Sequence, residues 1–217
     1  MKVVACYSNK GGVGKTATSV NLAYALTASG RRVLLCDLDP QGAAGFYFRV
    51  KPSRNLTGTR FFGDALRLAK AIRGSDYDGL DILPANLEFR DFDVLLSRLK
   101  SPRSRLKKAL AALDQDHDVI LLDCPPGLST LSENVFRAAN AIVVPVIPTT
   151  LSQRSFDQLL EFFADHDLPA DRLHGLFSMV QTGKRLHLDV MAALRSTQGA
   201  RFLTAAIRSP RMSSAWV

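Results

Sequence analysis

The strongest constraint on the fold is the alternation of short apolar runs with longer helical patterns. Runs rich in Val, Ile and Leu occur at Val3–Tyr7, Val33–Cys36, Leu80–Leu83, Val119–Leu122, Ala141–Val146, Leu173–Val180 and Phe202–Ile207. Helical patterns occur at Lys15–Ser29, Phe61–Arg73, Glu88–Leu99, Arg103–Leu113, Leu131–Ala139, Ser152–His166 and Leu186–Thr197. Apolar strands joined by helical crossovers are typical of parallel sheets buried on both faces. We therefore expect an α/β three-layer sandwich, with a mostly parallel twisted sheet and helices on both faces, in one domain over residues 1–217.

The composition is that of an ordinary globular domain. The chain of 217 residues is 47% hydrophobic and 22% charged, so disorder is not expected. The net charge of +8 suits a polyanionic partner, such as nucleic acid or an acidic membrane surface, although it also serves simple solubility. The three cysteines form no CxxC spacing, which argues against a zinc site or a disulfide framework and fits a reduced cytosol. The mixed segment Phe46–Thr59 predicts a long loop.

A glycine-rich string lies between the first predicted strand and the first predicted helix. It reads Asn9-Lys10-Gly11-Gly12-Val13-Gly14-Lys15-Thr16. Glycines let backbone N–H groups turn toward a phosphate, and the helix N-terminus adds positive potential. Lys15 is expected to reach the β- and γ-phosphates of a nucleotide, and the Thr16 hydroxyl to ligate Mg²⁺. The string therefore predicts a site for ATP and Mg²⁺ that is built by residues Lys10, Gly11, Gly12, Val13, Gly14, Lys15, Thr16 and Ala17.

Two of the apolar runs end in aspartates. Asp37 and Asp39 follow one run, in the string Asp37-Leu38-Asp39-Pro40-Gln41-Gly42, and Asp123 follows another, in Asp123-Cys124-Pro125-Pro126-Gly127. The carboxyl ends of parallel strands face the ligand crevice. Aspartates there can hold Mg²⁺ through water or orient an attacking water. We expect Asp39 and Asp123 at the metal site, and Asp37 is either near the metal or a structural aspartate at the strand end.

Together these three segments resemble the ParA/MinD family of P-loop ATPases. The glycine-rich string is similar to the family's deviant Walker A motif, residues 37–42 to its switch I, and residues 123–127 to its Walker B and switch II. The resemblance also takes in residues 143–149 and 202–208, and it covers essentially residues 1–212. Because the first predicted strand begins at Val3, no helix-turn-helix pattern precedes the loop, which resembles the short ParA type.

The resemblance implies roles for individual residues. Lys10 stands at the family's signature lysine, which contacts the ATP of a partner subunit. Together with Lys15 and Asp39 it would form the catalytic set, in which Asp39 positions or polarises the hydrolytic water. Asp123 would hold Mg²⁺ through water, and Gly127 would sense the γ-phosphate through its backbone N–H.

Two positions bear on the rest of the nucleotide. Ala17 stands where the family usually has a second threonine, so one hydroxyl contact with the α-phosphate is absent. The resemblance makes the loop around Pro210 a candidate wall for the adenine, whereas residues 178–180 show no clear motif that would read the base.

The resemblance also implies what the ATP cycle does. ATP would close a homodimer that binds double-stranded DNA without sequence preference, and a ParB-like or cargo-adaptor protein would stimulate a slow intrinsic hydrolysis. The outcome would be the positioning of a plasmid, chromosome or protein cargo over the nucleoid, in the cytoplasm.

The charge near the end of the chain fits this expectation. Residues 184–217 hold six basic side chains and one acidic side chain, and phosphate contact needs no base-reading motif. The candidate DNA-binding residues are Lys184, Arg185, Arg195, Arg201, Arg208 and Arg211. A second basic run, residues 98–108, reads more readily as a solvated face.

Other function classes fit less well. A MinD-like ATPase shares every phosphate-site motif but needs a basic amphipathic helix for the bilayer, and Arg211–Val217 is too short for one, so no membrane partner is expected. An ATP-dependent amide or carboxylate ligase needs its own polar substrate pocket, for which the sequence offers no candidate. An iron–sulfur reductase needs cysteines that share a cluster between subunits, and Cys124 alone does not supply them. A tyrosine kinase of this superfamily needs a cluster of tyrosines, whereas the four tyrosines here are scattered along the sequence.

Overall fold

The computed structural model describes residues 1–113 and 116–209. Its centre is an eight-stranded sheet in the order β3-β4-β2-β5-β1-β6-β7-β8. The strands are β1 (Lys2–Cys6), β2 (Val33–Asp37), β3 (Arg73–Gly74), β4 (Leu80–Leu83), β5 (Val119–Asp123), β6 (Ala141–Val146), β7 (Leu173–Val180) and β8 (Phe202–Arg208). Every neighbouring pair is parallel except β3–β4. The expected α/β architecture with a mostly parallel sheet is confirmed.

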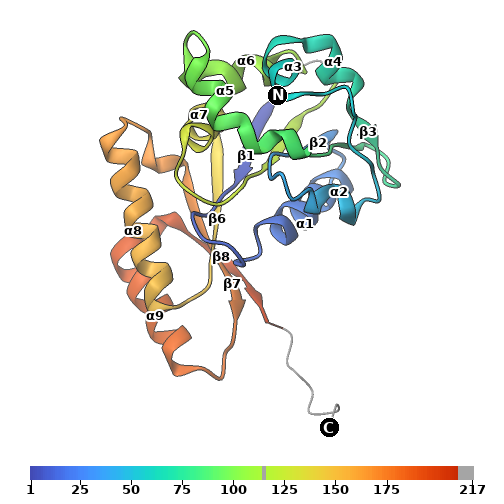
Figure 1. The fold of residues 1–217 in the computed structure, drawn as a ribbon. Helices are drawn as coiled ribbons and strands as arrows, with labels where there is room; N and C mark the ends of the chain where they lie inside the picture. The colour runs from blue at the N-terminus through green and yellow to red at the C-terminus, as the bar shows by residue number, and fades with distance from the viewer. Residues whose placement is uncertain (114–115, 210–217) are drawn as a thin grey trace.

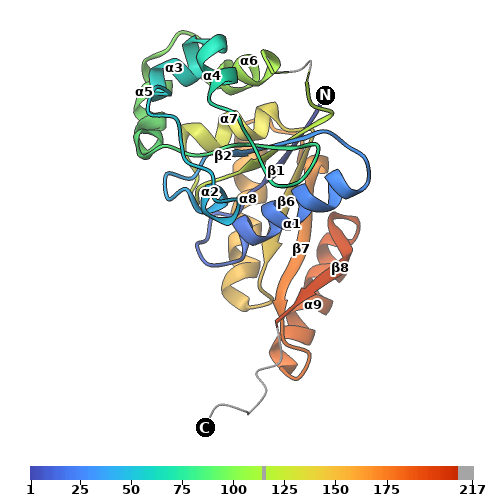
Figure 2. The ribbon, with the colours of Figure 1, turned by 90° about the vertical axis from the view of Figure 1, so that its right-hand side faces the viewer.

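Helices cover both faces of the sheet (Figures 1 and 2). They are α1 (Lys15–Ala28), α2 (Ala43–Tyr47), α3 (Gly58–Gly63), α4 (Ala65–Lys70), α5 (Phe92–Arg98), α6 (Arg105–Ala111), α7 (Thr130–Ala138), α8 (Thr150–Asp165) and α9 (Arg185–Gln198). Helices α1 and α2 pack on one face through a cluster that includes Ala23, Ala44 and Phe48. Helices α3 to α9 join the larger core on the other face. The sheet is therefore the middle layer of a three-layer sandwich.

The segment between β2 and β4 differs from the sequence-based expectation. The expectation of a single helix over Phe61–Arg73 is wrong, because α3 and α4 are separate helices. Asp64 between them is extended, and its carboxylate caps α4 by accepting from Arg67 N at 3.0 Å. The long loop expected at Phe46–Thr59 is shortened, since α2 ends within it and α3 begins within it. The two-residue antiparallel strand β3 was not expected, and two residues are too few to show a periodicity.

The sheet register brings the candidate segments together. β1 pairs with β5 so that Cys6 lies opposite Asp123, and β2 pairs with β5 so that Asp37 also lies opposite Asp123. The glycine-rich string follows the end of β1 and leads into α1. The three predicted segments therefore meet at the carboxyl ends of β1, β2 and β5, where ligands bind in open α/β sheets.

The three cysteines, Cys6, Cys36 and Cys124, are buried free thiols on or just after these central strands. Burial raises the pKa of Cys6 to about 12, so it stays protonated and packs as a small apolar side chain. In the part of the chain that the structure describes, no group of histidine, cysteine or acidic residues gathers as a metal-binding cluster. Among these same residues, no helix is both long enough and apolar enough to cross a bilayer.

Candidate functional site

The glycine-rich loop has a backbone that only glycine adopts without strain. Gly12 and Gly14 have φ values of +72° and +87°, in the left-handed region. Gly14 is also the N-cap of α1, and no side chain caps the helix there. The N–H groups of the first turn of α1 are therefore available to an anion at the loop, as the sequence predicted.

Lys15 lies folded over the loop. Its Nζ donates to the Lys10 carbonyl oxygen at 3.0 Å, and the residue is only 8% exposed. Burial lowers the pKa of Lys15, and the nearby carboxylates of Asp123 and Asp39 act against this shift. The ammonium group therefore lies inside the loop with two acidic groups close by, which is the place that a phosphate-binding lysine requires.

Asp123, at the end of β5, carries a buried carboxylate with one satisfied and one unsatisfied oxygen. Its Oδ1 accepts from the Ser19 hydroxyl at 2.9 Å, and its Oδ2 has no hydrogen-bond partner in the structure. Burial raises the pKa of Asp123 to about 6, while the hydroxyls of Thr16 and Ser19 lower it. An unpartnered buried carboxylate oxygen is costly, and a divalent cation with its waters would satisfy it. Thr16 and Asp123 thus fit the Mg²⁺ site that the sequence predicted.

Asp37 and Asp39 have different environments although they are two residues apart. Asp37 is fully buried, and its two oxygens accept from Asp39 N at 3.0 Å and Ala44 N at 3.1 Å. Burial, together with the charge of Asp123, raises the pKa of Asp37 to about 7. Asp39 is partly exposed, and its Oδ1 accepts from Gln41 N at 3.0 Å. Asp37 therefore holds the turn in place, while Asp39 presents its carboxylate at the mouth of the site.

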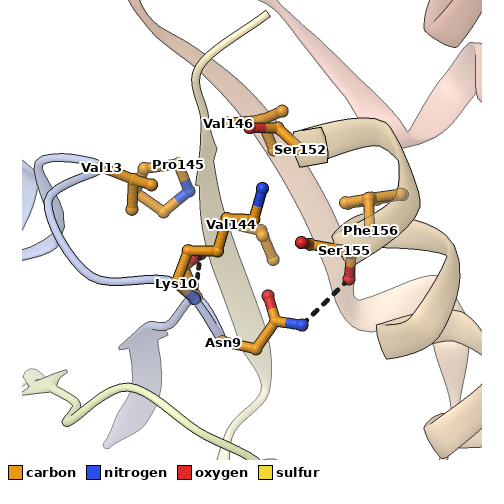
Figure 3. Close-up of a pocket in the computed structure, with 10 residues that line it drawn as sticks. Asn9, Lys10, Val13, Val144, Pro145, Val146, Ser152, Ser155 and Phe156 are labelled. Atoms are coloured by element: carbon orange, nitrogen blue, oxygen red, sulfur yellow. Dashed lines mark hydrogen bonds between the residues drawn. The ribbon is translucent and has the colours of Figure 1, made fainter. Parts of the chain in front are cut away.

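The entrance of the loop is tied to α8 (Figure 3). Asn9 Nδ2 donates to the Ser155 carbonyl oxygen at 3.2 Å, and Lys10 N donates to Ser8 Oγ at 3.3 Å. The hollow between the loop, β6 and α8 measures only about 10 Å³, the room of a single water molecule. This hollow is therefore too small for a nucleotide. The hydrogen bonds of Lys10 in the described residues use its backbone N and O, and none uses its ammonium group.

Gly127 lies in the segment between β5 and α7. Its φ of +99° requires glycine, and its carbonyl oxygen accepts from the Tyr7 hydroxyl at 3.0 Å. Tyr7 packs edge-on against Phe136 of α7 at 4.7 Å between ring centroids. The residue predicted to sense the γ-phosphate is thus anchored to the end of β1, beside the loop.

Three contacts of the loop region were missed by sequence reasoning. The Ser178 hydroxyl donates to the Val13 carbonyl oxygen at 2.7 Å, so the end of β7 supports the loop although residues 178–180 show no motif. Asn9 binds α8, as described above. Ser19 lies one helical turn after Lys15, on the same side of α1, and that spacing is the one signal by which it could have been found.

The predicted DNA-binding residues that the structure describes lie on α9 and at the two ends of β8. Lys184 and Arg185 lie at the start of α9, where Arg185 pairs with Asp189 at 2.9 Å, whereas Arg195 lies in its last turn. Arg201 precedes β8 and Arg208 ends it, so the two lie at opposite ends of the strand. Pro210 and Arg211 lie outside the described residues.

Comparisons with known proteins show the family to which the chain belongs. A family model described as an AAA domain matches residues 1–168. The sporulation initiation inhibitor protein Soj of Bacillus subtilis (strain 168) is 36% identical over 160 residues, which is 73% of this chain and 63% of the relative. The chromosome partitioning protein ParA of Myxococcus xanthus (strain DK1622) is 37% identical over 148 residues, 66% of this chain and 51% of the relative. The chain therefore spans between about half and two thirds of the length of these relatives.

Among solved structures, cobyrinic acid a,c-diamide synthase from Mycobacterium smegmatis, with a bound ATP analogue and magnesium, superposes with a TM-score of 0.85. It is 32% identical, and the match covers 96% of this chain and 87% of that chain. The family model spans more than half of the chain, and the curated relatives include proteins that partition chromosomes. The chain therefore belongs to the AAA-domain family, and within it to the ParA-like proteins.

Proposed function

We propose that the chain binds ATP with Mg²⁺ and hydrolyses it slowly, as a single-domain switch that dimerises on ATP and positions or segregates a cargo. The observation that carries this proposal is the buried carboxylate of Asp123, which interacts with Lys15 and Thr16 and whose Oδ2 has no hydrogen-bond partner among the described residues. A divalent cation with its bound waters would satisfy that oxygen, and a Mg²⁺–nucleotide supplies such a cation.

Each residue at the loop then has a separate task. The glycine-rich backbone and the first turn of α1 hold the phosphates, and Lys15 leaves the Lys10 carbonyl oxygen to bind the β- and γ-phosphates. Thr16 and Asp123 hold Mg²⁺, which when bound neutralises charge on the phosphate oxygens. Asp39 orients a water toward the γ-phosphate, and the N–H of Gly127 senses whether that phosphate is present.

Lys10 is assigned to a second subunit. Its side chain is partly exposed at the entrance of the loop, and no described contact of the chain engages its ammonium group. Partial burial already lowers the pKa of Lys10, so a phosphate from a facing subunit would stabilise the charged form. Binding of ATP by two chains would then complete both sites.

The output of the switch is binding to the nucleoid. The net charge of +8 and the basic residues along α9 and β8 supply phosphate contacts without base readout. The chromosome partitioning relative supports this output. A partner protein that accelerates hydrolysis would release the dimer from DNA, which gives the cycle its direction.

The proposal is tested by binding to a fluorescent duplex of random sequence, with ATP, with ADP and without nucleotide, each in the presence of Mg²⁺. We expect the chain to bind the duplex with ATP but not with ADP or without nucleotide, and this binding should weaken as the salt concentration rises. Lys15→Ala should not bind the duplex in any of the three conditions. Equal binding in all three nucleotide states contradicts the switch. Parallel sedimentation with anionic vesicles tests the MinD-like alternative, which predicts ATP-dependent binding to vesicles instead of DNA.

A second candidate, an ATP-dependent amide synthase, is favoured by the likeness to the Mycobacterium smegmatis enzyme. That reaction consumes ATP only when a carboxylate and a nitrogen donor are present. Phosphate release should therefore be measured with cobyrinic acid plus glutamine or ammonium, and separately with DNA. Stimulation by the acid and the nitrogen donor, with no response to DNA, would replace our proposal.

A further inference from the structure

A second cavity lies at the amino-terminal end of the sheet. It measures about 260 Å³ and is lined by Met1, Val3, Lys107, Leu110, Ala111, Arg137, Ala138, Asn140 and Arg172. These residues come from the start of β1, from α6, from the end of α7, and from the positions just before β6 and β7. The glycine-rich loop follows the opposite end of β1, so this cavity is separate from the nucleotide site.

The cavity is cationic. Three of its lining residues are basic and none is acidic. Arg137 is partly compensated, because its Nε and Nη2 donate to Glu133 Oε1 at 3.0 and 2.9 Å. Among the ion pairs of the described residues, none includes Lys107 or Arg172. Two full positive charges therefore face this end of the sheet without a carboxylate partner from the described chain.

The two arginines are held in place by the backbone. Arg137 Nη2 donates to the His166 carbonyl oxygen at 3.1 Å, and Arg172 Nη1 donates to the Ala139 carbonyl oxygen at 3.0 Å. The contacts in the structure leave Arg137 Nη1 and the Nε and Nη2 of Arg172 unused. Asn140 Oδ1 accepts from Val3 N at 2.8 Å, which leaves its amide nitrogen as a further donor. The cavity thus offers several anchored N–H donors and the exposed ammonium of Lys107.

We propose that this cavity is a binding site for a small anion that bears phosphate or carboxylate groups. A guanidinium presents paired donors that match the two oxygens of such a group, and charge-assisted hydrogen bonds of this kind are the strong ones. A volume of about 260 Å³ is close to the lower limit of small-molecule pockets, so the ligand is compact. Duplex DNA cannot enter a cavity of that size.

The test uses the complete chain loaded with ADP and Mg²⁺, which occupies the phosphate loop. Inorganic pyrophosphate and citrate are titrated separately by isothermal calorimetry, one as the phosphate probe and the other as the carboxylate probe. The matched variants are Lys107→Glu and Lys108→Glu. Both lysines are exposed neighbours on α6, but only Lys107 lines the cavity.

We expect at least one probe to bind at one site per chain. Lys107→Glu should weaken that binding by roughly tenfold or more, and Lys108→Glu by less than about threefold. Arg172→Lys, which keeps the charge but loses the paired donors, should also weaken it, and excess duplex DNA should leave it unchanged. Absence of binding by both probes, equal loss in the two lysine variants, or displacement by DNA would each overturn the proposal.

Discussion

At the scale of single residues, the positive charge of Lys15 is stabilised by two aspartates at the ends of neighbouring strands. Asp123 and Asp39 offset the effect of burial on its pKa, and Ser19 orients Asp123. Lys15 and Asp123 could be predicted because each stands in a short motif beside an apolar strand. Ser19 and Ser178 could not, since their partners are brought to them by packing between segments that are distant in the sequence.

The two lysines of the loop are predicted to differ when replaced. Lys15→Ala removes the ammonium that lies inside the loop, so the affinity for ATP should fall on the order of a hundredfold. Lys10→Ala should leave ATP affinity of the monomer nearly unchanged, because the Lys10 side chain makes no described contact within the chain. Titration with a fluorescent ATP analogue at low protein concentration measures both. Equal losses would mean that Lys10 serves its own nucleotide.

His187 predicts a dependence of stability on pH. It is buried, its Nδ1 accepts from Gln181 N at 3.1 Å, and burial lowers its pKa, with Lys184 adding to the shift. Below about pH 6.5 the histidine of the unfolded chain gains a proton, while the folded one stays neutral. His187 therefore contributes to the free energy of unfolding above that pH, and this contribution is lost as the pH falls.

The matching variant is His187→Gln. The difference in free energy of unfolding between the original chain and this variant should shrink between about pH 7.5 and about pH 5.5. Urea denaturation at several pH values measures it. A difference that stays constant over this range would show that His187 does not contribute to the acid sensitivity.

At the scale of elements, the strands were the easiest to predict and the segment after β2 the hardest. Continuous apolar runs mark buried parallel strands, and seven of the eight strands lie where such runs occur. The helical pattern over residues 61–73 failed because Asp64 caps a new helix instead of continuing the first one. A competing cap of this kind interrupts a pattern that is otherwise periodic.

The pairing of β7 with β8 depends on a close approach that only glycine permits. A Cβ at Gly175 would lie 2.5 Å from the ring of Phe202, which stacks on Phe177 at 4.5 Å between centroids. Gly175→Ala should therefore displace Phe202 and lower the free energy of unfolding by about 1–3 kcal/mol. Gly183→Ala is the control, because nothing lies within 4 Å of its Cβ position. Thermal or urea unfolding compares the two, and similar stabilities would contradict the packing argument.

At the scale of the whole molecule, folding separates residues that are close in the sequence and gathers others. The basic residues from 184 to 208 are spread along α9 and β8, so a DNA surface needs either a long contact or a second chain beside the first. By contrast, Tyr24, Tyr47 and Tyr77, which are scattered in the sequence, line one hollow of about 240 Å³. Neither arrangement could be predicted, because each depends on the path of the chain between the elements.

The central claim is that ATP joins two chains through Lys10. The direct measurement is sedimentation analysis of Asp39→Ala, which should keep ATP unhydrolysed, with ATP or ADP and Mg²⁺. We predict a dimer with ATP, a monomer with ADP, and a monomer in both nucleotides when Lys10→Ala is added. A chain that stays monomeric with ATP, or whose dimer does not depend on the nucleotide and on Lys10, would contradict the account.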